Sequence, residues 1–133
     1  MIARVATGYL LVAGAVVASI GLGMVAMPNA FYGSYGIDPH ISVDLANELR
    51  SPGLWLVMTG LVIGLGAFRP DLRRLSLGTA AIFYLSYAAA RGISIALDGL
   101  PGAGLMIAAA SELVLGMGGA ALWWRAAPSL HRP

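Results

Sequence analysis

The sequence lacks cysteine and lysine, and it has few charged residues of either sign. The absence of cysteine excludes disulfide bonds, thiolate metal ligands and a cysteine nucleophile. Charged residues make up 11% of the chain, against about 25% in ordinary soluble domains, and 59% of its residues are hydrophobic. A chain of 133 residues could not bury that much apolar surface in water. We therefore expect an integral membrane protein that forms one domain, residues 1–133.

The basic residues are all arginines, eight of them against six acidic residues. A basic chain can bind nucleic acid, but such binding needs basic residues interleaved with aromatic ones on one face. Here the arginines are scattered, mostly near the ends of apolar runs. The net charge of +2 therefore reflects membrane topology, and we expect no nucleic-acid partner.

Motifs of the common catalytic, nucleotide and metal sites are also missing. The sequence contains no phosphate-binding loop of the Gly-xxxx-Gly-Lys-Ser/Thr type and no dinucleotide fingerprint. His40 and His131 are predicted on opposite sides of the membrane, so they cannot share a metal ion. No histidine is predicted at membrane depth, where it could activate a serine. We expect no catalytic residue, no metal site and no cofactor.

Four apolar segments are long enough to cross a bilayer, which takes about 20 helical residues each. These segments cover residues 5–27, 45–68, 77–97 and 105–124. The stretches between them carry turn residues, among them Pro28, Pro70 and the pair Asp98-Gly99. Short connections make consecutive helices antiparallel, so the sequence predicts an all-α, four-transmembrane-helix up-down bundle.

The arginines also predict how the bundle is oriented. Six of them fall on one side if the chain crosses four times: Arg4, Arg69, Arg73, Arg74, Arg125 and Arg132. The opposite loops hold Asp38, His40 and Asp44, with Asp98 at the second turn. Positive residues stay in the cytoplasm, so both termini are expected there. The Ala-, Gly-, Leu- and Val-rich composition is typical of a GC-rich bacterial genome, which predicts the bacterial inner membrane.

The start of the second span has two interpretations. Only residues 53–68 are free of charge, which is short for a crossing. Ser51 and Pro52 could cap and begin the helix there. Alternatively the helix begins near Ser42 or Asp44 and kinks at Pro52. We favour the kinked helix because it has the full length.

The segment between the first two spans contains an aromatic run, Ala30-Phe31-Tyr32-Gly33-Ser34-Tyr35. We expect a short interfacial segment that lies on the outer leaflet. Its aromatic residues would anchor the protein at the interface. The alternative is a lid over a ligand cavity.

Polar residues in the third span follow helical spacing. Tyr84, Tyr87, Arg91, Ser94 and Asp98 are three or four residues apart and share one face, which must point into the bundle. At 1.5 Å per residue, Arg91 lies about 10 Å below the outer end of its helix and Glu112 about 12 Å below the same end. Glu48 and Arg50 lie about 6–9 Å down by the same count. We expect these two acids and two arginines to pair, as charges in hydrocarbon must.

The candidate cluster therefore consists of Asn47, Glu48, Arg50, Tyr84, Tyr87, Arg91, Ser94, Asp98 and Glu112. It has three interpretations. It could be a structural ion-pair network that fixes helix register, or a polar cavity, open outward, that binds a ligand. The third is a proton relay through Glu112, which a neighbouring arginine argues against.

Small residues predict close helix packing. Gly60 and Gly64 are spaced for one helix to approach another, as are the pairs Gly14 with Ala18 and Gly116 with Ala120. We expect packing within one chain. Homodimerisation is the alternative.

Several motifs together resemble a known family. They are Met-Pro-Asn-Ala-Phe-Tyr at 27–32, Tyr-Gly-Ile at 35–37, Ala-Asn-Glu-Leu-Arg at 46–50, Arg91 through Asp98-Gly99, and Ser-Glu-Leu at 111–113. The chain resembles, over nearly its whole length, a bacterial family of small four-helix membrane proteins classified as a domain of unknown function. The Asn-Glu-Leu-Arg motif is the most specific part, and Pro52 departs from the unbroken helix expected after it. The resemblance implies the fold and a shared charged cluster but no activity.

Two functions are compatible with this sequence. The first is a non-enzymatic accessory or scaffold subunit of a membrane assembly, because the chain is small and carries no catalytic motif. The alternative is a protein that binds or transports a lipid, a quinone or another amphipathic molecule in an outward-facing polar pocket. The expected partners are membrane lipids and either another membrane protein or a second copy of the chain.

Overall fold

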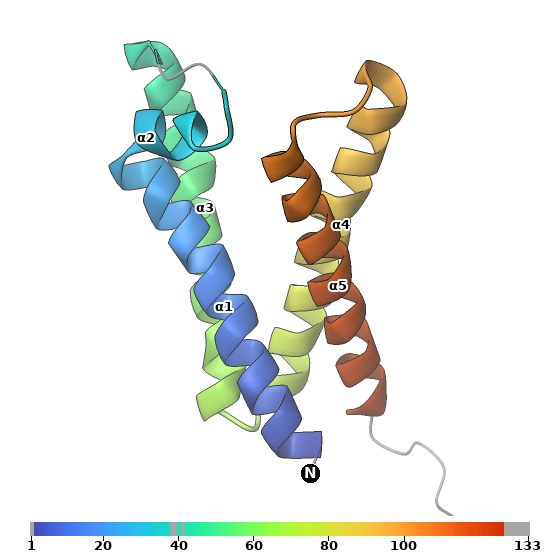
Figure 1. Cartoon of the computed structure of the whole chain (residues 1–133). Coiled ribbons are helices and arrows are strands. Elements are labelled where there is room, and N and C mark those ends of the chain that lie inside the picture. Colours follow the sequence, from blue (N-terminus) through green and yellow to red (C-terminus); the bar gives the residue numbers. More distant parts are fainter. Residues whose placement is uncertain (1, 38–39, 41, 127–133) are drawn as a thin grey trace, which may run out of the picture.

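The computed structural model is all-helical, with four long helices and one short helix (Figure 1). It describes residues 2–37, 40 and 42–126. The helices are α1 (Ile2–Ala26), α2 (Pro28–Gly33), α3 (Val43–Phe68), α4 (Arg73–Asp98) and α5 (Ala103–Arg125). Each long helix is long and apolar enough to cross a membrane. The predicted four-helix bundle, with a short segment between its first two spans, is confirmed, and the protein is a multi-pass membrane protein.

The second span is the longer of the two helices that the sequence allowed. The Ser42 side chain caps α3 by accepting a hydrogen bond from the Leu45 N–H at 3.1 Å. Asp44 lies in the first turn, where a negative charge suits the helix dipole. Pro52 lies inside the helix, as the kinked interpretation requires.

The helices pack as two pairs, α1 with α3 and α4 with α5 (Figure 1). The pairs meet near the N-terminus, at what we call the narrow end, which holds the α3–α4 connection and the end of α5. They diverge toward the wide end, which holds α2 and the α4–α5 connection. Within the described residues α3 and α5 do not contact each other. The divergence leaves space between the two pairs in the wide half of the bundle.

Glycines bring the backbones of α1 and α3 together. A Cβ atom added to Gly14 would lie 2.7 Å from the Gly60 carbonyl oxygen, and one added to Gly60 would lie 2.6 Å from the Ala18 nitrogen. A Cβ on Gly21 would lie 2.5 Å from the Gly53 carbonyl oxygen. A larger side chain at these positions would push the helices apart, so Gly14 and Gly60 pack within the chain as predicted. Gly64, predicted to act together with Gly60, differs, because a Cβ added to it would meet nothing within 4 Å.

Hydrogen bonds from side chains to helix carbonyls fix the two pairs against each other. Ser76 in α4 donates to the Val62 carbonyl of α3 at 2.7 Å. Tyr9 in α1 donates to the Leu115 carbonyl of α5, also at 2.7 Å. These bonds satisfy polar groups inside the bundle, where no water is available.

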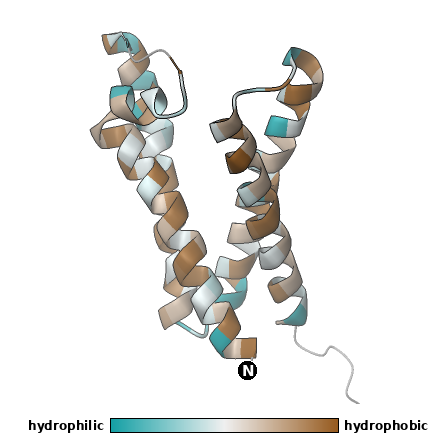
Figure 2. Cartoon of the chain, in the orientation of Figure 1, coloured by the Kyte–Doolittle hydropathy of each residue, from teal (hydrophilic) through white to brown (hydrophobic). Residues whose placement is uncertain are grey.

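Apolar side chains cover the outer surface of the bundle. Trp55, Ile82 and Val114 are each at least 70% exposed. Hydrophilic residues gather mainly toward the helix ends in Figure 2, while apolar ones cover much of the helices between them. An apolar surface of this extent indicates contact with a membrane.

Candidate functional site

A cavity of about 710 Å³ lies between the two helix pairs in the wide half of the bundle. Its walls come from α1, α3, α4 and α5, and the aromatic residues of α2 and the turn after it line its wide end. Most of the lining is apolar, for example Val16, Ile20 and Leu56. Its size lies within the range of about 300–1,000 Å³ that is typical of small-molecule sites.

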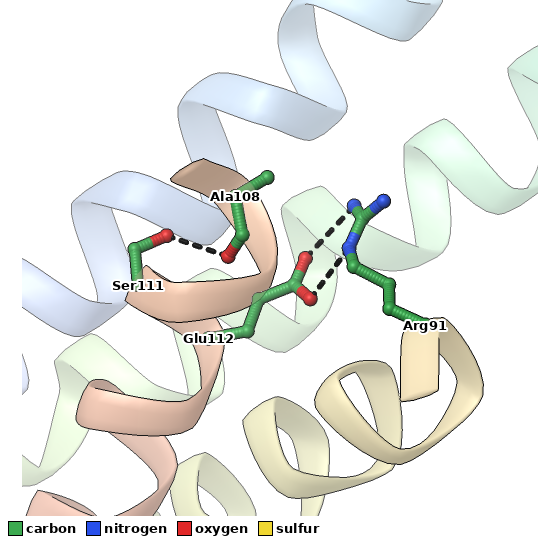
Figure 3. A network of polar contacts seen from close by, with 4 residues as sticks. All are labelled: Arg91, Ala108, Ser111 and Glu112. Atoms are coloured by element: carbon green, nitrogen blue, oxygen red, sulfur yellow. Dashed lines mark hydrogen bonds and ion pairs between the residues drawn. The ribbon is translucent and has the colours of Figure 1, made fainter. Parts of the chain in front are cut away.

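Two of the residues that line the cavity, Arg91 and Glu112, form the ion pair shown in Figure 3. The Arg91 Nε donates to one carboxylate oxygen of Glu112 at 2.7 Å, and Nη2 donates to the other at 2.9 Å. The Glu112 side chain is 12% exposed and that of Arg91 is 29% exposed. The pairing that the depth argument predicted is therefore present, with the bidentate geometry in which arginine binds carboxylate best.

One nitrogen of Arg91 stays open. The Nη1 group makes no hydrogen bond within the described part of the chain, and no dashed line reaches it in Figure 3. Because Arg91 lines the cavity, a bound molecule could accept hydrogen bonds from this group. Arginine has donors only, so the partner must be an acceptor.

Two tyrosines of α4 have different roles at the cavity. Tyr84 is buried, and its hydroxyl donates to the Ala13 carbonyl of α1 at 2.7 Å, which joins the two helix pairs at the cavity wall. Tyr87 packs against Phe83, with ring centroids 4.7 Å apart. Among the described residues, its hydroxyl has no hydrogen-bond partner. Tyr84 therefore holds the fold, while the Tyr87 hydroxyl keeps its hydrogen-bonding capacity open at the cavity.

The aromatic run after α1 contributes three further residues. Phe31 makes edge-to-face contacts with Tyr32 and Tyr35, with centroid distances of 5.2 and 5.4 Å, and all three line the cavity. Burial raises the pKa of the Tyr32 phenol above its usual value of 10, and the nearby Tyr87 phenol adds to this effect. The Tyr32 hydroxyl therefore keeps its proton at neutral pH and can donate a hydrogen bond. This placement supports the lid alternative.

Our site prediction did not include the aromatic residues that line the cavity with Tyr84 and Tyr87: Phe31, Tyr32, Tyr35 and Phe83. A signal for three of them was visible in the sequence. Phe31, Tyr32 and Tyr35 are close together in the segment between the first two spans, where aromatic side chains need an apolar surface against which to pack.

The structure divides the remaining predicted residues between two other places. Ser94 and Asp98 are exposed near the end of α4, where the Ser94 hydroxyl donates to Asp98 at 3.1 Å. Asn47, Glu48 and Arg50 are exposed on α3, and none of them lines the cavity.

The four-charge network is not formed, because Glu48 and Arg50 do not join the Arg91–Glu112 pair. The Arg50 Nε instead donates to the Val25 carbonyl of α1 at 3.2 Å. The physical reason is the divergence of the bundle: toward the wide end, α3 follows α1 away from α4 and α5 (Figure 1). Equal depth in the membrane therefore does not make these charges neighbours.

The chemistry available in the cavity is hydrogen-bond donation inside an apolar space. Among the described lining residues, the open donors are the Arg91 Nη1 group and the hydroxyls of Tyr32, Tyr35 and Tyr87, because the Tyr84 hydroxyl donates to the Ala13 carbonyl. Both oxygens of the Glu112 carboxylate already accept from Arg91. Within the described residues, no three His, Asp or Glu side chains gather in a way that could hold a metal ion.

Comparison with known proteins places the chain in a family. It belongs to the DUF4345 family, described as a domain of unknown function, which matches residues 5–125. The resemblance seen in the sequence motifs is thereby confirmed over most of the chain. No curated protein and no solved structure is detectably similar to it. The description of the family assigns no activity, and the four membrane spans are those of the structure.

Proposed function

We propose that this member of the DUF4345 family binds one amphipathic small molecule, such as a membrane lipid, between its two helix pairs. The observation that carries the proposal is the cavity itself, about 710 Å³ in volume, apolar over most of its wall and polar at one place. An apolar chain would lie along Val16, Ile20 and Leu56, and a polar group would lie beside Arg91. This division of the wall matches a molecule with one apolar part and one polar part.

The unpartnered donors support binding over a purely structural role. A register-fixing ion pair needs only its two partners, and Arg91 with Glu112 provides them. It leaves the Arg91 Nη1 group and the Tyr87 hydroxyl, on two residues that line the cavity, without an acceptor in the described residues. Both groups remain accessible, because no buried side-chain nitrogen or oxygen in the described part of the chain lacks a hydrogen-bond partner. A ligand that enters the cavity can therefore accept hydrogen bonds from them.

We further propose that the narrow end faces the cytoplasm of a bacterial inner membrane, which puts both termini there. Supporting this orientation, the described arginines of that end are Arg4, Arg69, Arg73, Arg74 and Arg125, while Arg132 lies outside the described residues. The wide end carries the acidic residues Asp44 and Asp98. Positive-inside placement then puts the cavity in the outer half of the membrane. The ligand would come from the outer leaflet.

The test of binding is purification in a mild detergent followed by native mass spectrometry and analysis of the extracted small molecules. Ala108→Phe places a ring into the cavity, which Ala108 lines. Ala110→Phe is the matched control, because Ala110 is exposed on the same helix and lines none of this cavity. We expect the unchanged protein and Ala110→Phe to retain a molecule in a one-to-one ratio and Ala108→Phe to lose it. Equal retention by both variants would contradict binding in the cavity.

The same purification tests the accessory-subunit function. A stoichiometric protein partner that co-purifies while the cavity holds no molecule would favour that function over ligand binding. A retained small molecule without a protein partner supports the proposal.

A further inference from the structure

We infer that the ligand group beside Arg91 is an uncharged carbonyl oxygen, which excludes an anionic or cationic headgroup from this position. The inference rests on the proposed function, because it assumes that the cavity binds a ligand. It adds the chemical class of that ligand, which can be wrong while binding itself is right.

The first reason for an uncharged ligand group is the charge of the cavity wall. Among the described residues that line it, Arg91 and Glu112 are the only charged ones, so the wall that these residues form is neutral as a whole. Their bidentate contact uses both carboxylate oxygens and neutralises the guanidinium. A phosphate, carboxylate or ammonium group placed here would find no free counter-charge among the described lining residues. A charge in an apolar interior without a partner is strongly unfavourable.

The second reason is that the open polar groups of the cavity are hydrogen-bond donors. The Arg91 Nη1 group can only donate, and the tyrosine hydroxyls nearby can donate as well. Tyr32, Tyr35 and Tyr87 line the same cavity as Arg91. These side chains come from α4, α2 and the turn after α2, yet all line one cavity. A carbonyl oxygen has two lone pairs and no charge, so it suits several donors around a neutral pair.

Two kinds of membrane molecule carry such a carbonyl. One is an acyl ester and the other is a quinone ring, and the aromatic residues Phe31, Phe83 and Tyr87 offer flat apolar contact to either. The carbonyl is the shared chemistry, and separate probes distinguish the two sources.

The experiment measures binding of four probes to the purified protein by native mass spectrometry in detergent. The probes are methyl palmitate, decylubiquinone, hexadecyl sulfonate and hexadecyltrimethylammonium. Methyl palmitate and the two ions carry chains of similar length, so they differ chiefly in the charge of the polar group. We expect the ester or the quinone to bind about tenfold more tightly than either ion, or better, because an unpaired buried charge costs more than one factor of ten. A preference between the ester and the quinone names the source.

One variant should weaken the preference of the cavity for an uncharged polar group over an anionic one. Glu112→Gln leaves Arg91 without its counter-charge, so we expect hexadecyl sulfonate to bind about tenfold more tightly than it binds the unchanged protein. The double variant Arg91→Gln with Glu112→Gln is the control. It is neutral again and should not gain sulfonate binding.

The outcomes separate the inference from the function on which it rests. Sulfonate or ammonium binding to the unchanged protein as tightly as the ester and the quinone would overturn the carbonyl assignment and leave ligand binding intact. A charged molecule retained from native membranes would do the same. A protein that takes none of the probes and retains no molecule would overturn the proposed function itself. The comparison of probes on the unchanged protein decides the inference even if Glu112→Gln does not fold.

Discussion

Arg91 on α4 holds both carboxylate oxygens of Glu112 on α5, at 2.7 and 2.9 Å, inside a membrane-spanning bundle. The two residues lie on consecutive helices, whose connection spans residues 99–102. Together they form a polar patch in the wall of a mostly apolar cavity. Charges at this depth are tolerated in hydrocarbon only when they are paired. The pair is therefore a condition of the fold, and in the function that we propose it decides which ligand groups the cavity accepts.

The close contact between α1 and α3 is tested by two glycines one helical turn apart. A Cβ on Gly60 would lie 2.6 Å from backbone atoms of α1, whereas a Cβ on Gly64 would meet nothing within 4 Å. We expect Gly60→Ala to lower the free energy of unfolding by about 1–3 kcal/mol, because the helices must move apart. Gly64→Ala should leave it unchanged. Thermal unfolding in detergent measures both.

Size-exclusion chromatography of the same two variants tests the homodimer alternative. If Gly64→Ala converts a dimer into a folded monomer, then this face of α3 lies between two copies, and our expectation of packing within one chain is incomplete.

The role of Tyr84 as a link between helix pairs is tested against Tyr87 on the same helix face. Tyr84→Phe removes the hydrogen bond to the Ala13 carbonyl, and we expect a loss of about 0.5–1.5 kcal/mol in stability. Tyr87→Phe removes a hydroxyl with no partner among the described residues, so stability should not fall. Ligand retention should show the opposite order, with the larger loss in Tyr87→Phe. Equal effects of both variants on stability and on retention would contradict the separate roles.

The proposed orientation is tested by cysteine labelling, for which the cysteine-free chain is well suited. Leu100→Cys places a thiol in the connection at the wide end, and Pro70→Cys places one in the connection at the narrow end. We expect a membrane-impermeant maleimide to label the first in intact cells and the second only after the inner membrane is opened. Labelling of Pro70→Cys in intact cells would invert the orientation.

The sequence predicted the Arg91–Glu112 pair because α4 and α5 are joined by a short turn. Counting residues from that turn gives each charge its depth, and antiparallel neighbours at equal depth can touch. The same count could not place Glu48 and Arg50. The helices α1 and α3 approach each other closely through Gly14 and Gly60. Their divergence from α4 and α5 depends on this packing, which counting residues along the sequence does not reveal.

The aromatic run at residues 30–35 shows a second limit of sequence reasoning. Helix α2 has only six residues, which is too short for hydrophobic periodicity to indicate which face is buried. An aromatic run suits a membrane interface and a cavity equally well. In the structure Phe31, Tyr32 and Tyr35 line the cavity, a placement that the sequence pattern alone does not indicate.

An exposed ion pair in the same chain provides a control for the buried one. Arg69 and Asp71 pair at 3.0 Å at the narrow end, with side chains about 60% exposed. Exposed pairs contribute about 0–1 kcal/mol, so Arg69→Gln and Asp71→Asn should each change the stability little. A large loss of stability in these two variants would show that breaking an exposed ion pair is also costly. The losses at Arg91 and Glu112 could then not be assigned to burial of the pair.

The most direct test of the account is a double-mutant cycle on Arg91 and Glu112, measured as unfolding free energy in detergent. We predict that Arg91→Gln and Glu112→Gln each cost about 3–5 kcal/mol, because each leaves one buried charge without its partner. The double variant should recover much of that loss, since no unpaired charge is left. Losses that simply add in the double variant would show that the two residues do not interact, and would contradict the neutral, paired site from which the proposed ligand class follows.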